Sequence, residues 1–255
     1  MIRRTMLVAM LASLVAGAIN AIAGGGTNVS FPALLWLGLP PVVANATSTV
    51  GMWPGSLAGA WGFQRSLRQA RPAWFWLLLP SMIGGAIGAA LLVVLPSSIF
   101  AGVAPWLVLG STLLFAGQTL RLQRRPDAAA PPAVGRRSLV AAYLVQLAIA
   151  VYGGYFGAGI GILMLASLGL SGVRDLGQAN GLKNLFAAAI NGAAVVYLGL
   201  AGVVLWSTAG AMALGAIAGG WAGAWLAQRL PRMVLRWTIV AISLLMTAAT
   251  FATLR

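Results

Sequence analysis

Two glycine-rich breaks interrupt apolar sequence that is otherwise long enough to cross a membrane. The first reads A-G-G-G-T-N-V-S over residues 23–30, and the second reads G-G-Y-F-G-A-G-I-G over residues 153–161. Each glycine costs about 1 kcal/mol of helix propensity relative to alanine, so three in succession do not suit a straight helix. In hydrocarbon, unpaired backbone groups are tolerated only where protein buries them or where they line a polar cavity. The breaks therefore predict a substrate path.

The composition is that of a membrane protein. Of the 255 residues, 60% are hydrophobic and only 7% are charged, whereas a soluble domain carries nearer a quarter charged residues. Apolar segments of about 20 residues recur from end to end, and each can span a hydrocarbon core of about 30 Å. We therefore predict an all-α polytopic membrane protein.

The residue types also limit the chemistry. The sequence has no cysteine and no histidine, and its only carboxylates are Asp127 and Asp175, both in predicted loops. The usual metal, haem and iron–sulfur ligand sets and any intramembrane carboxylate relay are therefore missing. We predict no cofactor, no metal and no enzymatic role. The net charge of +14 comes mainly from arginines in short loops, which suits contact with lipid headgroups rather than nucleic acid.

Apolar segments occur in the same order on both sides of a polar stretch rich in proline and arginine. They cover residues 6–23, 29–37, 42–63, 74–95 and 99–120 in the first half, and 138–152, 160–170, 176–200, 203–226 and 234–254 in the second. We predict an N-terminal transmembrane repeat over 1–120, a basic linker over 121–137 and a C-terminal transmembrane repeat over 138–255. The first segment resembles a secretory signal peptide, but we expect no cleavage because the second half repeats the break in the chain interior.

An internal alignment supports the duplication. With an offset of 131 residues, Gly26 falls on Gly157 and L-L-W-L-G-L falls on L-A-S-L-G-L. After a further shift of four residues, Ala44 and Asn45 fall on Ala179 and Asn180.

The arginines guide the choice between two topologies. If every long segment spans, the halves are parallel, and the loop around Arg65 and the matching loop around Arg229 lie on opposite faces. If the first segment and its short successor form a hairpin, the halves are inverted and the strongly basic loops all lie inside, as the positive-inside rule prefers. We favour inverted repeats, each with a Gly-broken or re-entrant first helix followed by three transmembrane helices. Arg3 and Arg4 then lie outside.

Each half-helix that begins inside the membrane presents unpaired N–H groups and a partial positive charge. Two such N-termini, near Asn28 and near Gly159, predict a shared anion site. The alternative is that the glycines of the breaks serve tight helix packing, as we expect for Gly84, Gly85 and Gly88 and for Gly215, Gly219 and Gly223. Thr27, Asn28 and Ser30 beside the first break favour cavity lining.

The helix after each break carries further polar residues: Asn45, Thr47, Ser48 and Thr49 in the first half, and Asn180, Lys183, Asn184 and Asn191 in the second. A lysine inside an apolar span costs at least about 2.5 kcal/mol and is therefore informative. On a helix the four residues of the second set share one face, where a fixed ammonium flanked by amides suits a small oxyanion. The alternatives are that Lys183 snorkels to the interface or pairs with Asp175.

The lack of acidic residues favours an anion over a cation as cargo. An anion that leaves a cell with a negative interior gains about 2.3 kcal/mol per charge per 100 mV, so export can run on the membrane potential alone.

Several stretches resemble a known family. They are G-G-G-T-N-V-S-F-P-A-L-L-W-L-G-L-P-P-x-x-A-N-A-T-S, its weaker second copy, and A-N-G-L-K-N-L-F-A-A-A-I-N. They resemble the sulfite exporter TauE/SafE family of membrane permeases, over nearly the whole chain. The resemblance implies transport, usually outward, of sulfite, sulfonates such as sulfoacetate or related organosulfur anions across the bacterial inner membrane. The second copy departs from the first at Leu163, which replaces Pro32, and at Leu182-Lys183, which replaces Thr47-Ser48.

We therefore predict an exporter of small anions with a midplane site. The predicted substrate-binding residues are Gly24, Gly25, Gly26, Thr27, Asn28, Asn45, Thr47, Ser48, Gly157, Gly159, Gly161, Asn180, Lys183 and Asn184. Trp53, Trp61 and Phe156 are candidates to close the site. The expected partners are a small anion and membrane lipid. Two alternatives stay open: a non-transporting membrane anchor subunit, and an intramembrane redox or enzymatic component.

Overall fold

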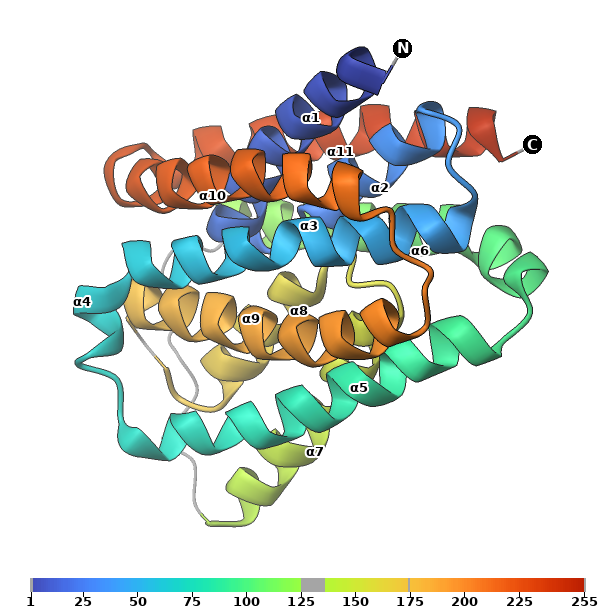
Figure 1. The fold of residues 1–255 in the computed structure, drawn as a ribbon. Helices are drawn as coiled ribbons and strands as arrows, with labels where there is room; N and C mark the ends of the chain where they lie inside the picture. The colour runs from blue at the N-terminus through green and yellow to red at the C-terminus, as the bar shows by residue number, and fades with distance from the viewer. Residues whose placement is uncertain (1, 125–135, 174, 255) are drawn as a thin grey trace.

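Every element in the described part of the chain is a helix (Figure 1). The computed structural model describes residues 2–124, 136–173 and 175–254. The first half contains α1 (Ile2–Ala23), α2 (Thr27–Trp36), α3 (Pro41–Gly62), α4 (Gln64–Leu67), a 3-10 helix (Pro72–Leu77), α5 (Leu78–Val94) and α6 (Ser97–Arg124). The second contains α7 (Arg136–Tyr155), α8 (Ile160–Leu170), α9 (Leu176–Leu200), α10 (Trp206–Arg229) and α11 (Arg232–Thr253).

Six stretches among these helices are long and apolar enough to cross a membrane. They are Thr5–Ala23, Pro72–Val94, Ser97–Arg121, Leu176–Leu200, Trp206–Arg229 and Met233–Thr253. The prediction of an all-α polytopic membrane protein is confirmed. Helix α3 is absent from this set although its 22 residues give it a length of about 33 Å. Its buried asparagine, serine and threonine side chains lower its hydropathy.

The helix contacts repeat between the halves. Helix α1 packs along α10 and α7 packs along α5, while α3 lies against α10 and α9 lies against α5. Helices α3 and α9 contact each other near the centre of the bundle, and α6 contacts α11 (Figure 1). In these contacts α1 corresponds to α7, α3 to α9, α5 to α10 and α6 to α11. Each of the contacts named above therefore has a counterpart in the other half.

Helices α3 and α9 run in opposite directions. The indole N–H of Trp53 on α3 donates to the carbonyl oxygen of Ala188 on α9 at 3.0 Å. Thr47, earlier on α3, accepts a hydrogen bond at 3.0 Å from the N–H of Leu205, which lies beyond the end of α9. Advancing along α3 therefore means moving back along α9.

Helices α6 and α11 are antiparallel in the same way. The ring of Trp106 lies 5.3 Å from that of Phe251. Further along α6, Gln118 accepts a hydrogen bond at 2.7 Å from Arg236, near the start of α11.

Glycines outside the breaks allow close packing between helices. A Cβ added at Gly219 of α10 would collide with the carbonyl oxygen of Leu14 on α1, and one at Gly88 of α5 would collide with that of Val151 on α7. The stripes to which these two glycines belong therefore bring backbones together, as predicted.

The predicted linker lies mostly outside the described residues. Helix α6 continues to Arg124, beyond the predicted repeat boundary at 120, and α7 begins at Arg136. The residues between them, Asp127 included, lie outside the described ranges.

Candidate functional site

The two glycine breaks meet inside the molecule. The backbone N–H of Gly161, at the start of α8, donates to the carbonyl oxygen of Gly24, just after α1, at 3.2 Å. A Cβ added at either glycine would collide with the backbone of the other. The tips of the α1–α2 and α7–α8 hairpins are therefore in direct backbone contact.

Backbone conformation explains why glycine stands at three of these positions. Gly24, Gly157 and Gly159 have φ angles of 77°, 83° and 74°, in the left-handed region. Side chains with a Cβ rarely adopt this region. These glycines therefore end α1 and begin α8 abruptly, without a long connecting loop.

Lys183 and Asn184 of α9 bind the end of α1. The ammonium Nζ of Lys183 donates to the carbonyl oxygens of Asn20 and Ala21, at 2.8 Å each. The amide of Asn184 donates to Ala21 at 3.3 Å. The carbonyl oxygen of Asn20 also accepts a hydrogen bond from the backbone N–H of Gly24 at 2.9 Å. The carbonyls at the end of a helix carry partial negative charge, so a buried ammonium stabilises them.

The first half makes a corresponding contact with the second. Asn45 of α3 donates through its side-chain amide to the carbonyl oxygen of Tyr155, the last residue of α7, at 2.9 Å. Each central helix thus binds the broken helix of the other half.

Neither sequence-based alternative for Lys183 matches its contacts. Its side chain is 1% exposed, so it does not snorkel to an interface. Asp175 instead begins α9, where its carboxylate accepts a hydrogen bond from the N–H of Gln178 at 2.7 Å.

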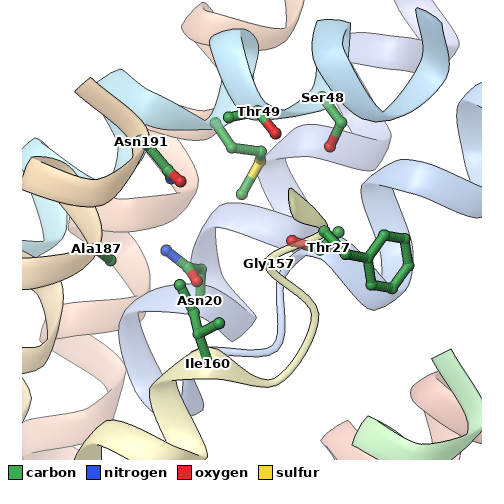
Figure 2. A pocket seen from close by; sticks show the side chains of 10 residues that line it. Asn20, Thr27, Ser48, Thr49, Gly157, Ile160, Ala187 and Asn191 are labelled. Atoms are coloured by element: carbon green, nitrogen blue, oxygen red, sulfur yellow. The ribbon is translucent and has the colours of Figure 1, made fainter. Parts of the chain in front are cut away.

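A small cavity lies beside the meeting point of the breaks (Figure 2). Its lining residues come from α1, α2, α3, α9 and the second break: Asn20, Thr27, Ser48, Thr49, Met52, Phe156, Gly157, Ile160, Ala187 and Asn191. On α3 and α9 these residues lie about halfway along the helix. The cavity therefore lies between the central stretches of the two central helices.

The cavity is small. The volume open to the centre of a water-sized sphere is about 20 Å³, which is room for about one water molecule. An organic anion fits only after the surrounding helices move apart.

Several polar groups of the lining have no protein partner. Asn20 donates to the hydroxyl of Ser56 at 3.2 Å, and the hydroxyl of Ser48 bonds that of Ser30 at 2.6 Å. The side chains of Thr27, Thr49 and Asn191 make no hydrogen bond to any residue in the described ranges and are free to bind a ligand.

The N-terminus of α2 borders the cavity at Thr27. Among the described residues, no side chain caps α2 or α8. The backbone N–H groups of Asn28, Val29 and Ser30 donate to the carbonyl oxygens of Gly25 and Gly26. The helix N-terminus still contributes a partial positive charge near the cavity.

Three of the fourteen predicted site residues line the cavity, namely Thr27, Ser48 and Gly157. The others surround the breaks: Gly24 and Gly161 contact each other, Gly25, Gly26 and Gly159 lie in the breaks, Asn45, Lys183 and Asn184 bind helix ends, and Thr47 accepts from Leu205. Asn28 accepts a hydrogen bond from Ser111 at 2.7 Å. The buried side-chain oxygen of Asn180 has no partner within the described residues.

Some lining residues were not predicted as binding residues. Thr49 and Asn191 belong to the predicted polar helix faces, whereas Asn20 lies in an apolar segment, where a lone asparagine was the available signal. Of the three proposed closing aromatics, Phe156 lines the cavity. Trp53 donates a hydrogen bond to Ala188 of α9, and the side chain of Trp61 is 67% exposed.

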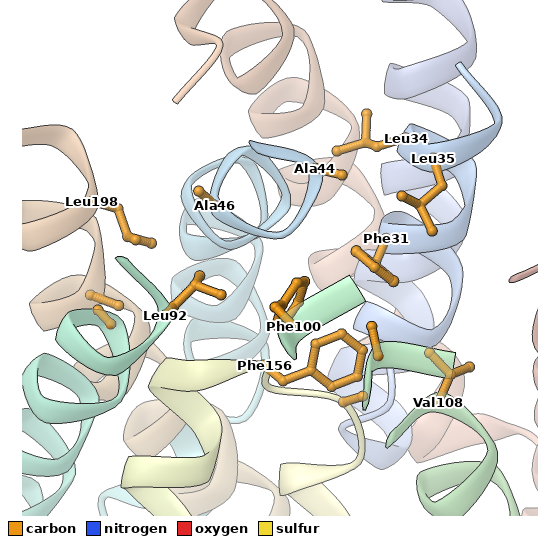
Figure 3. Packing of buried hydrophobic residues seen from close by; sticks show 14 of the residues in the cluster. Phe31, Leu34, Leu35, Ala44, Ala46, Leu92, Phe100, Val108, Phe156 and Leu198 are labelled. Atoms are coloured by element: carbon orange, nitrogen blue, oxygen red, sulfur yellow. The ribbon is translucent and has the colours of Figure 1, made fainter. Parts of the chain in front are cut away.

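Phe156 of the cavity lining packs in a cluster of aromatic rings (Figure 3). The ring of Phe156 lies 5.2 Å from that of Phe31 and 5.7 Å from that of Phe100, both edge to face. Tyr155 adds a further edge contact to Phe100 at 5.6 Å. Phe100 lies in the first turn of α6, so this cluster of four rings lies toward the end of the molecule where α6 begins.

These features define a class of protein. Paired broken helices that meet beside a polar cavity, within a bundle of apolar helices, are typical of multi-pass membrane transporters. The sequence profile of the sulfite exporter TauE/SafE family matches residues 9–250. The chain belongs to this family of membrane transporters.

Curated relatives agree with this assignment. A probable membrane transporter protein of Haemophilus influenzae is 31% identical over 92% of this chain and 89% of its own length. One from Sinorhizobium is 28% identical over 92% and 87%, respectively. The probable membrane transporter protein YfcA of Escherichia coli is 26% identical over 92% and 86%. No solved structure matches the chain.

Proposed function

We propose that the protein exports small organosulfur anions, such as sulfite or sulfoacetate, through the central cavity. The observation that carries this proposal is the set of unpartnered hydroxyl and amide groups of Thr27, Thr49 and Asn191, gathered where the two helix breaks meet. Hydroxyls and amides can donate hydrogen bonds to the oxygens of sulfite and sulfonate groups.

The charges around the cavity support an anion. The N-terminus of α2 and the buried Lys183 contribute positive potential. Within the described ranges the one acidic side chain is that of Asp175, which is exposed at the start of α9. A cation would therefore find no carboxylate at this site.

The site residues divide into two groups in this proposal. Thr27, Ser48, Thr49 and Asn191 contact the anion directly. The glycines of the breaks, Asn28, Asn45, Thr47 and Asn184 hold the hairpin tips and the central helices in place.

The proposed topology is that of inverted repeats in the bacterial inner membrane. The opposite directions of α3 and α9, and of α6 and α11, support inversion. Helices α3, α6 and α10 then end on the same side, where Arg65, Arg121 and Arg229 lie. The positive-inside rule makes this the cytoplasmic side, and export of the anion follows the membrane potential.

Transport by purified protein in liposomes tests this function. Counterflow of labelled sulfite or sulfoacetate should exceed that of empty liposomes. Thr49→Val and Asn191→Leu should each raise the half-saturation concentration about tenfold, because each removes hydrogen bonds to a charged ligand.

The matched control is Thr119→Val. Thr119 is also a buried threonine, but its hydroxyl bonds the carbonyl oxygen of Phe115 on its own helix at 2.8 Å. This variant should transport as the wild type does. If the wild type moves none of these anions and co-purifies with a stoichiometric partner, the anchor-subunit alternative is favoured instead.

A further inference from the structure

Lys183 lies behind the wall of the cavity and does not line it. Its ammonium contacts the backbone oxygens of Asn20 and Ala21, and the side chain of Asn20 forms part of the cavity wall (Figure 2). One residue of α1 therefore separates the buried charge from the space where a ligand binds.

No described carboxylate neutralises this charge. The acceptors of Lys183 are two backbone carbonyls, which carry only partial charges. Because the lysine is 1% exposed, water and salt screen it weakly, so its potential extends into the cavity.

The positive charge of Lys183 has no counterpart at the aligned position of the first half. The residue of the first half that aligns with Lys183 is Ser48. Ser48 lines the cavity and bonds the hydroxyl of Ser30 at 2.6 Å. The two halves therefore offer unequal surroundings to a bound anion, with positive potential on the side of α1 and α9.

We propose that Lys183 sets the charge preference of the cavity, favouring dianions over monoanions, and that it positions Asn20 as a further residue that contacts the anion. Lys183 acts through the end of α1 and makes no contact with the anion itself. This inference rests on the proposed function, because it assigns roles at the same cavity.

The test compares two sulfonates of similar size and different charge. Sulfoacetate carries two negative charges at neutral pH, and 2-hydroxyethanesulfonate carries one. The readout is the ratio of their transport efficiencies, each the maximum rate divided by the half-saturation concentration, in liposomes without a membrane potential.

Neutral substitutions of Lys183 should change this ratio. Lys183→Met removes the charge, and Lys183→Gln removes it while keeping a donor for the carbonyls of α1. Each should lower the dianion-to-monoanion ratio about tenfold, and Lys183→Arg should retain it. Asn20→Ala should lower both efficiencies in similar proportion, because it removes a contact and no charge.

The matched control is Arg121→Gln, which removes one positive charge from an exposed position on α6. It should leave the ratio unchanged. A purely structural role for Lys183 would reduce both transport rates together, so an unchanged ratio in Lys183→Met and Lys183→Gln would overturn the inference.

A further variant tests the inference if neither Lys183→Met nor Lys183→Gln yields protein that inserts into the membrane. Ser48→Lys adds a second charge to the wall and should raise the ratio above that of the wild type; an unchanged ratio there also contradicts the inference. If the wild type transports neither sulfonate, the proposed function fails first. Transport by the wild type with an unaltered ratio in the variants rejects only the role of Lys183.

Discussion

At the scale of single residues, the glycines of the first break have different roles. Gly24 combines a left-handed φ of 77° with backbone contact to Gly161. Gly25 has neither feature, since a Cβ added there would come no closer than 3.8 Å to its nearest neighbour. Adjacent glycines in one run therefore differ in how well they tolerate substitution.

Alanine substitutions at these two positions should separate the roles. Gly24→Ala should destabilise the protein by at least about 2 kcal/mol, because it adds both strain and a collision. Gly25→Ala should change stability by less than about 1 kcal/mol. Thermal unfolding in detergent measures both, and equal melting temperatures for the two variants would contradict this account.

Residue types alone could not place the site in full. The helical spacing of Asn180, Lys183 and Asn184 predicts one polar face on α9, yet the direction of a long lysine side chain depends on the carbonyls of α1 that it meets. Asn20 reaches the cavity only through the way in which α1 packs on α10. Sequence periodicity identifies a helix face but not the neighbour that the face meets.

At the scale of elements, the two sides of the cavity differ in chemistry. Phe156 and its aromatic neighbours lie on the side toward the start of α6. By the internal alignment, the residue that matches Phe156 is Gly25. On the side toward the end of α3, Asn20 and Ser56 form a polar contact. Aromatic rings therefore border the cavity on one side, and a hydrogen bond borders it on the other.

Removal of the Phe156 ring should open the cavity on its aromatic side. The natural sequence has no cysteine, so a single cysteine introduced as Thr49→Cys reports access to the cavity. With Phe156→Ala added, a membrane-impermeant thiol reagent applied from the side opposite the arginine-rich loops should react at least about tenfold faster, because a buried aromatic barrier is lost.

The matched control for this experiment is Phe115→Ala. Phe115 is also buried, at 2% exposed, but it packs near Arg236, with the guanidinium 5.3 Å from its ring centre. Similar acceleration in both variants would indicate general loosening and would reject a specific barrier at Phe156.

The sequence predicted the elements well. Nine of the ten apolar segments correspond to one helix each, and the short segments correspond to α2 and α8. The segment 74–95 covers both the 3-10 helix and α5. Helix α4 was not predicted, because a helix as short as Gln64–Leu67 has too few residues to display a hydrophobic period.

At the scale of the whole molecule, the first turns of α1 and the last turn of α11 lie on the same side of the bundle (Figure 1). The direction of α3 and α9 determines this arrangement, and it depends on contacts between residues more than a hundred positions apart. Local sequence patterns do not reveal such contacts. The positions of the arginines were the sequence evidence for the relative direction of the two halves.

Tags on the two termini should therefore be accessible from one side of the membrane, and we expect the outside. A tag in the loop of Arg65, Arg68 and Arg71 should be accessible only from the cytoplasm. Protease protection in intact cells and in inverted vesicles measures this. Both terminal tags on the cytoplasmic side, with the loop of Arg65, Arg68 and Arg71 also inside, would return the parallel arrangement of the halves.

The hydrogen bond between Gly161 and Gly24 has a mechanical consequence. Because this bond joins the two hairpin tips, one hairpin can move only if the other moves with it or if the bond breaks. We expect the tips to move as one unit, so that a path cleared on one face is accompanied by a tighter seal on the other. The membrane barrier to ions would then persist throughout the transport cycle.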